Sequence, residues 1–315
     1  MHSSEILVPL RRACAILGLA LLAGCSSAPD PPEFEVDVKN RASEFAEFGN
    51  QYFNRGEYDL ALRFFNLSLD ENVSVDHLPG IARSHNSIAR VHTASGNLDA
   101  ARTSVESALE FARLAEDEAE QTQALINRGE IALREGNLEA ALRDFERAEE
   151  RGSADDAEQD PVLLHNLGTL YARQESFEDA RRMFEQARGI NETQRNWAEL
   201  ASNYYMLASI TSRQGQLEQA RDYALQALDY DKRAENSPGI ASDLQALGRI
   251  SERLGEDDDA YRYYLRSLRV YLSFNSIPGS LTTLESLEAV ALRTGRDAEA
   301  EEFAAQQTRI RESLR

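Results

Sequence analysis

An all-α solenoid of seven helix–turn–helix units is the fold that three features of this 315-residue sequence predict. The first feature is a set of glycines in one register, namely Gly56, Gly96, Gly136, Gly215, Gly255 and Gly295. The second is an alignment of seven units, which start near residues 42, 82, 122, 161, 201, 241 and 281 and lie 39 or 40 residues apart. The third is an apolar face of helical period on both sides of each break. Such self-similarity indicates a solenoid, because each unit buries its apolar face only against its neighbours.

The composition excludes several classes of function. The chain has 54 acidic and 34 basic residues and a formal net charge of −20. This balance argues against nucleic-acid binding, which needs a basic face against the phosphates. The two cysteines, Cys14 and Cys25, are too few for a disulfide framework or a cysteine-rich zinc site.

Residues 1–24 are predicted to be a secretory signal peptide. Arg11 and Arg12 precede an uncharged apolar run, residues 13–23, which is too short for a permanent membrane span. The run ends in Leu-Ala-Gly-Cys, which resembles the lipobox of bacterial lipoproteins. The resemblance implies cleavage before Cys25 and lipid on Cys25, and Ser26 implies the outer rather than the inner membrane. An ordinary signal peptide followed by a chance cysteine is the alternative.

Residues 25–41 are expected to form a tether between the lipid and the folded body. The stretch that follows Cys25 is Ser-Ser-Ala-Pro-Asp-Pro-Pro-Glu, which is polar and rich in proline and favours an extended chain. At roughly 3.1 Å per residue, residues 28–35 would hold the body about 25 Å from the membrane. The solenoid then occupies residues 42–315.

The fourth unit shows the internal pattern of a unit most clearly. Its two runs are Leu164, Leu167, Gly168 and Tyr171, then Ala180, Phe184 and Ala187. Within each run the offsets of 3, 4 and 7 define one helix face, so each unit is expected to contain a first and a second helix. Small residues at 168 and 180 allow the two helices to approach closely. The glycine of each break ends the first helix, since it adopts a left-handed conformation at low cost.

These runs resemble the tetratricopeptide repeat, whose signature is W-x-x-L-G-x-x-Y in the first helix and A-x-x-x-F-x-x-A in the second. The resemblance extends from residue 42 to about residue 307 and implies a right-handed solenoid. The period is longer than the usual one of about 34 residues and is similar to that of the longer-repeat branch of the family. HEAT repeats share this length, but their pattern fits the glycine and alanine positions poorly.

Three places depart from the repeat pattern. Glu175 occupies the break position of the fourth unit, where the other units have glycine. Glu288 and Ala304 replace the small and the aromatic residue of the last unit, which is therefore expected to be a loosely packed cap. The acidic stretch 152–160 is expected to be an exposed loop between the third and fourth units.

No catalytic site, cofactor or metal is predicted. His85 and His92 share a helix face, but both occupy positions that the packing of the repeat buries, so core residues are favoured over metal ligands. Asp257-Asp258-Asp259 lacks the alternation of a calcium loop. The sequence also lacks a G-x-S-x-G, a P-loop and a G-x-G-x-x-G motif.

The resemblance implies that the first helices line a ligand groove. Its groove positions give the candidate binding residues Arg83, Asn86, Arg90, Asn127, Glu130, Arg134, Asn166, Arg173 and Arg213. Asn127 and Asn166 share one position, at which an amide can bond an extended ligand's backbone. A further position holds arginine in five successive units, namely Arg134, Arg173, Arg213, Arg253 and Arg293. This column either binds an acidic ligand or stabilises helix ends, by about 0.3–1 kcal/mol each.

The predicted function is a non-enzymatic protein-interaction scaffold. By resemblance to envelope lipoproteins, we expect it to be lipid-anchored at the outer membrane, to face the periplasm and to bind a segment of another envelope protein. The alternative is a periplasmic sensor or regulatory subunit that binds a peptide or an anionic glycan. An apolar groove would favour the scaffold and a polar groove the sensor. A homo-oligomer without a ligand is a third possibility.

Overall fold

The computed structural model describes residues 33–152 and 160–314, and in these ranges all regular secondary structure is helical. The helices are α1 (Glu33–Asn54), α2 (Tyr58–Ser74), α3 (Leu78–Ala94), α4 (Leu98–Leu114), α5 (Glu118–Arg134), α6 (Leu138–Gly152), α7 (Pro161–Arg173), α8 (Phe177–Gln194), α9 (Trp197–Arg213), α10 (Leu217–Arg233), α11 (Ser237–Leu254), α12 (Asp257–Ser273), α13 (Ile277–Arg293) and α14 (Asp297–Ser313). Residues 38–315 form one compact unit.

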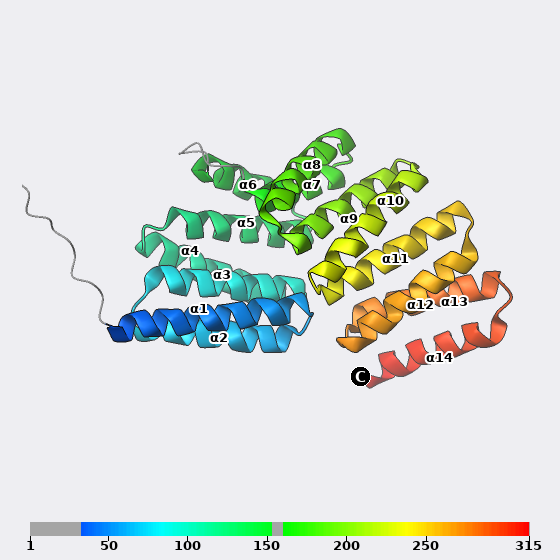
Figure 1. Cartoon of the computed structure of the whole chain (residues 1–315), viewed down its shortest axis with the longest axis horizontal. Coiled ribbons are helices and arrows are strands. Elements are labelled where there is room, and N and C mark those ends of the chain that lie inside the picture. The colour runs from blue at the N-terminus through cyan, green and yellow to red at the C-terminus, as the bar shows by residue number, and fades with distance from the viewer. Residues whose placement is uncertain (1–32, 153–159, 315) are drawn as a thin grey trace, which may run out of the picture. The chain divides into compact units, whose positions relative to one another are not determined.

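The helices alternate as the sequence predicts, with each odd-numbered helix followed by its even-numbered partner (Figure 1). Every helix from α2 onward packs against the next one along the chain, and the first helices of successive units also contact one another, as α3 contacts α5 and α7 contacts α9. The prediction of an all-α repeat solenoid is confirmed.

The breaks between the first and second helices have the predicted backbone conformation. All six glycines of the register have positive φ, from 71° at Gly295 to 82° at Gly96. Glu175, which takes the place of glycine in the fourth unit, adopts φ 62°. A side chain at this φ is strained but not excluded, so glycine is preferred here without being obligatory.

Glycines inside the first helices allow the close packing that the sequence predicts. A Cβ atom on Gly129 would lie 2.3 Å from the ring of Phe145, and one on Gly168 would lie 2.7 Å from that of Phe184. Both rings are fully buried. The missing side chain therefore makes the space that the aromatic residue of the second helix fills.

The helical region starts earlier than expected. Helix α1 begins at Glu33, within the segment 25–41 that was expected to be an extended tether, and it is 22 residues long. Its start is favoured by Glu33 and Glu35, because acidic side chains stabilise a helix N-terminus. Val38 is 1% exposed, so this earlier turn also has a core face. The signal peptide, Cys25 and residues 26–32 lie outside the described residues, as do residues 153–159 of the expected loop.

The last unit is better packed than its sequence suggests. Phe303, one residue before Ala304, is 7% exposed and supplies the aromatic side chain that position 304 lacks. Glu288 accepts a hydrogen bond from Nε2 of Gln307 at 2.7 Å. The expectation of a loosely packed cap is therefore wrong for this part of the unit, because Phe303 of α14 fills the space that an aromatic residue at position 304 would fill.

Candidate functional site

The candidate binding residues lie on the first helices α3, α5, α7 and α9, and we call the surface that they form the A-helix face. It contains arginine and asparagine side chains in each of units two to four, and glutamate in the third. The face is therefore polar. A polar groove is the type that favours a sensor over a scaffold.

Asn86 and Asn127 bind each other rather than pointing freely outward. Nδ2 of Asn127 donates to Oδ1 of Asn86 at 3.1 Å and to its carbonyl oxygen at 3.3 Å. Nδ2 of Asn86 in turn donates to Oε2 of Glu120 at 3.1 Å. The two asparagines are 4% and 6% exposed. The prediction that the Asn127 amide faces a ligand is thus not supported by its geometry, since both of its neighbours lie within the protein.

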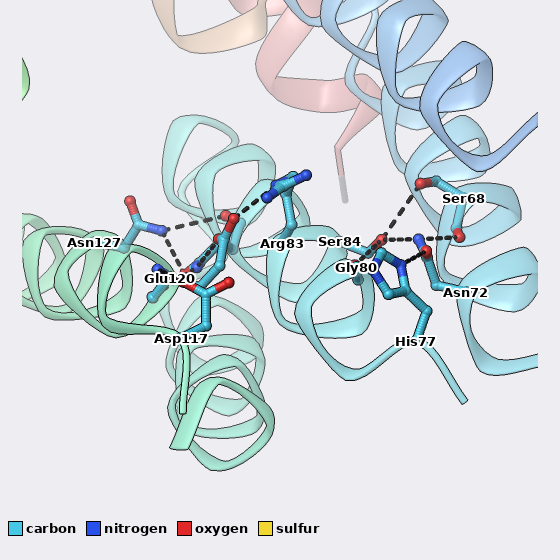
Figure 2. A network of polar contacts seen from close by, with 10 residues as sticks. Ser68, Asn72, His77, Gly80, Arg83, Ser84, Asp117, Glu120 and Asn127 are labelled. Carbon is cyan, nitrogen blue, oxygen red and sulfur yellow. Dashed lines mark hydrogen bonds and ion pairs between the residues drawn. The ribbon is translucent and has the colours of Figure 1, made fainter. Parts of the chain in front are cut away.

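Glu120 is the centre of this network, and the sequence reasoning missed it. Its Oε1 accepts a hydrogen bond from Nε of Arg83 at 2.6 Å, and the Glu120 side chain is almost fully buried (Figure 2). Asp117 caps helix α5 by accepting from the Glu120 backbone N–H at 3.0 Å. The signal in the sequence was Asp117-x-x-Glu120, which has the spacing of a capping box.

Arg90 is a partly buried cation of the A-helix face. Its guanidinium lies 4.8 Å from the ring centre of Phe53, and Nη2 donates to Oδ1 of Asn50. Its Nε is buried and has no hydrogen-bond partner among the described residues. Burial lowers the pKa of Arg90, and the carboxylates of Glu199 and Glu130 offset this only in part. A ligand oxygen at this site would satisfy an N–H that the protein leaves unpaired.

Asn166 has a second unpaired donor. It is 6% exposed, and its Nδ2 has no partner among the described residues. Asn203, on the next first helix, also has an unpaired Nδ2, while its Oδ1 lies 2.9 Å from Nδ1 of His165. Buried amide donors without partners are uncommon in folded proteins. The fourth and fifth units therefore differ from the second and third, whose asparagines are saturated.

The arginine column forms hydrogen bonds within the protein. Arg173 donates to the carbonyl oxygen of Leu133, and Arg213 donates to that of Ala172 at 2.8 Å. Arg253 donates to the carbonyl of Ser212 at 2.6 Å. Each arginine thus satisfies a carbonyl at the end of the preceding unit's first helix, where intrahelical partners are missing.

The two ends of the column pair with carboxylates, and Arg213 pairs with Glu175 at 3.0 Å in addition to its carbonyl. Arg134 pairs with Glu130 at 3.0 Å, and Arg293 pairs with Glu252 at 2.7 Å. This arrangement favours the helix-end interpretation over the ligand column. Because Arg213 keeps 42% of its side chain exposed, an additional contact with a ligand is still sterically open.

The histidines considered as metal ligands lie in packed surroundings. The ring of His85 stacks on that of Phe111, with the centres 5.8 Å apart, and burial lowers the pKa of both His85 and His92. In residues 33–152 and 160–314, no group of three or more His, Cys, Asp or Glu side chains is placed to hold a metal ion. Among the same residues, no helix is long and apolar enough to cross a membrane.

A buried pair of carboxyl groups lies between α10 and α11. Asp231 and Asp243 are 4% and 1% exposed, and Nδ2 of Asn236 donates to Asp231 at 2.8 Å. Burial raises the pKa of both groups, and the adjacent Asp231 charge raises that of Asp243 further. One retained proton lets the carboxyls hydrogen-bond to each other; without it, neither Asp243 oxygen has a partner among the described residues.

The first and second units have neutral residues at the equivalent positions. Nδ2 of Asn72 lies 3.4 Å from Oγ of Ser84, and Oδ1 of Asn72 lies 2.9 Å from Nδ1 of His77 (Figure 2). This site has no carboxyl group. Asp231 and Asp243 therefore place two carboxyl groups where Asn72 and Ser84 place an amide and a hydroxyl.

Comparison with known proteins agrees with the repeat fold. The family model for the tetratricopeptide repeat matches residues 120–193 and 199–273. No curated protein matches the sequence.

Several solved structures share the fold. The crystal structure of a Rap protein complexed with competence and sporulation factor is 13% identical, with a TM-score of 0.63 over 87% of this chain and 77% of that one. The apo quorum sensor NprR from B. thuringiensis is 15% identical, with a TM-score of 0.61 over 88% and 77%. BtubC from P. vanneervenii is 22% identical, with a TM-score of 0.57 over 69% and 90%.

Proposed function

Since this chain is a tetratricopeptide-repeat protein, we propose that it is a non-enzymatic scaffold whose A-helix face binds an extended segment of another protein. The observation on which this depends is the pair of unpaired donors on that face, Nε of Arg90 and Nδ2 of Asn166. An extended segment presents free carbonyl oxygens, and its acidic side chains complement an arginine. Ligand oxygens would thus satisfy donors that the protein alone leaves buried and unpaired.

We propose further that the partner is an envelope protein and that Cys25 is lipidated at the outer membrane, facing the periplasm. The support is the sequence Leu-Ala-Gly-Cys after an uncharged apolar run. A lipid-modified Cys25 would place helix α1 only a few residues from the membrane surface, since α1 begins at Glu33. Labelling with a radioactive fatty acid, comparing the wild type with Cys25→Ser, tests the modification directly.

A ligand-responsive regulator is the second candidate, and the polarity of the A-helix face favours it. Two of the similar structures are described as a Rap protein in complex with competence and sporulation factor and as a quorum sensor. In this version the ligand is a peptide or an anionic glycan. A regulator would show a rise in melting temperature when the ligand is added, because a ligand that binds only the folded state stabilises it.

The test of the scaffold is capture from detergent-solubilised envelope with the tagged full-length chain as bait. We expect the wild type to retain one defined protein and the double variant Arg90→Ala, Asn166→Ala to lose it. The matched control is Arg63→Ala, Arg143→Ala, which changes two exposed side chains on second helices. Equal capture by all three baits would exclude the A-helix face as the binding surface.

A further inference from the structure

The turn between α1 and α2 makes a contact that the five other glycine turns do not make. Gly56 is buried, whereas Gly96, Gly136, Gly215, Gly255 and Gly295 are exposed. A Cβ on Gly56 would lie 2.9 Å from the ring of Phe274 and 3.0 Å from Pro238. A Cβ on any of the other five would meet nothing within 4 Å. Gly56 therefore lacks a side chain for a packing reason as well as for its positive φ.

The contact joins the first unit to units that are distant in sequence. Pro238 lies at the start of α11, and Phe274 lies at the end of α12. Beside them, Arg55 and Glu235 approach to 3.9 Å. A cavity of about 660 Å³ lies at this junction and is lined by the α1–α2 turn, the start of α2, Ser95, Ser237 and residues 273–275.

The same junction lies next to the A-helix face. Tyr58, two residues after Gly56, is close enough to Arg134 of α5 and to Tyr271 of α12 to interact electrostatically with both. Arg90 of α3 interacts in the same way with Glu199 of α9. Tyr58 of the first unit thus interacts with side chains of the third and sixth units, and Arg90 of the second unit interacts with one of the fifth. Ser95, at the end of the first helix α3, lines the cavity at the junction itself.

The contact is small and weakly held. The Arg55 and Glu235 side chains are 48% and 77% exposed, and an exposed ion pair at this distance adds little to stability. Its apolar part is one glycine against one ring and one proline. Adjacent units of a solenoid, in contrast, are joined along whole helices, so the long-range contact is the weakest one in the assembly of repeats.

We propose that the α1–α2 turn is a reversible latch, which docks on Pro238 and Phe274 and limits entry of a protein segment to the A-helix face. The regulatory part of this inference rests on the proposed function, whereas the latch itself does not. When the latch is closed, the α1–α2 turn lies against Pro238 and Phe274. When it opens, the first unit moves away and a segment has access to the A-helix face.

Disulfide trapping tests the closed state. In a full-length chain with Cys14→Ser and Cys25→Ser, Gly56→Cys and Phe274→Cys introduce the only two thiols. The ideal Cβ of residue 56 is 3.2 Å from Cγ of Phe274, which brings the two Cβ atoms within the range of a disulfide. We expect oxidised glutathione to consume both thiols in this pair and to leave both in the control pair Gly96→Cys, Phe274→Cys. Retained thiols in the first pair, or equal loss in both, would overturn the latch.

A second variant keeps the proposal testable if the cysteine pair disturbs folding. Asparagine tolerates the left-handed conformation, so Gly56→Asn and Gly96→Asn have a similar backbone cost, but only the side chain at 56 meets Phe274 and Pro238. Small-angle scattering should show a larger radius of gyration for Gly56→Asn and the wild-type value for Gly96→Asn. Equal radii for the two variants would contradict the latch.

The capture experiment separates regulation from binding. The cysteine-pair bait should retain the partner when reduced and lose it when oxidised. Equal capture in both states would refute the control of entry and leave the scaffold intact. If neither the reduced nor the oxidised bait retains a partner, and the wild-type bait retains none either, the scaffold is refuted. The disulfide-trapping result would still show whether the latch exists.

Discussion

The double substitution Asp231→Asn, Asp243→Ser replaces the buried carboxyl pair by the neutral residues found at the equivalent positions of the first and second units, Asn72 and Ser84. Burial raises the pKa of both aspartates in the folded protein, while the unfolded chain loses these protons above about pH 4. The folded state therefore holds more protons than the unfolded state in this range. The stability that these protons contribute is present at low pH and is lost as the pH rises.

The size of the effect follows from one retained proton. Each proton held only by the folded state lowers the free energy of unfolding by about 1.4 kcal/mol per pH unit, so the loss from about pH 5 to about pH 7 is roughly 2.7 kcal/mol. The double variant lacks this loss. We therefore expect the difference in stability, variant minus wild type, to rise by up to that amount over this interval.

Urea unfolding followed by circular dichroism at several pH values measures this difference. His85 and His92 titrate in the same interval with the opposite sign, because burial lowers their pKa, but they are present in both proteins and cancel in the difference. The single variant Asp231→Asn introduces the residue found at the equivalent position, Asn72. It shows how much of the pH dependence of stability is removed when only one of the two carboxyl groups is replaced. Parallel stability curves for the wild type and the double variant would refute the shared proton.

Three other predictions test the packing and the polar network. Gly129→Ala should lower the free energy of unfolding by about 1–3 kcal/mol, because its Cβ would lie 2.3 Å from the Phe145 ring. Gly189→Ala, whose Cβ would meet nothing within 4 Å, should raise the free energy of unfolding by roughly 0.5–1 kcal/mol. Equal stabilities of the two variants in urea unfolding would contradict this packing. Glu120→Ala should cost about 1–3 kcal/mol because it leaves buried donors unpaired, and a neutral result in the same assay would show that the network is dispensable. Arg213→Ala should cost less than about 1.5 kcal/mol, since it loses a partly exposed hydrogen bond to Ala172 and an exposed ion pair with Glu175. A larger fall in thermal midpoint than that of Glu120→Ala would contradict its role.

The repeat architecture is predictable because its causes are local. The glycines that end the first helices and those that face Phe145 and Phe184 act within a single unit, so their spacing alone indicates both the turn and the helix pair. The early start of α1 was missed because the prolines before it suggested an extended chain. The acidic residues of the first turn, Glu33 and Glu35, were the contrary signal.

The candidate site is less predictable because its contacts join different units. Asn127 occupies the position of a ligand-binding amide, yet Asn86 of the preceding unit lies close enough to bind it, and this depends on how the units are rotated relative to each other. The same argument applies to Arg213, whose partner is a carbonyl of the previous unit. The contact of Gly56 with Phe274 depends on the rotation accumulated over several units, which no local pattern specifies.

Binding at the A-helix face is the central claim, and site-specific photo-crosslinking in living cells tests it most directly. A photoreactive amino acid is placed at Glu130, on that face, and in a second variant at Arg143, which is exposed on the second helix α6. We predict that irradiation joins the chain to one defined protein from position 130 and to none from position 143. Adducts from position 143 alone, or the same adducts from both positions, would contradict the claim.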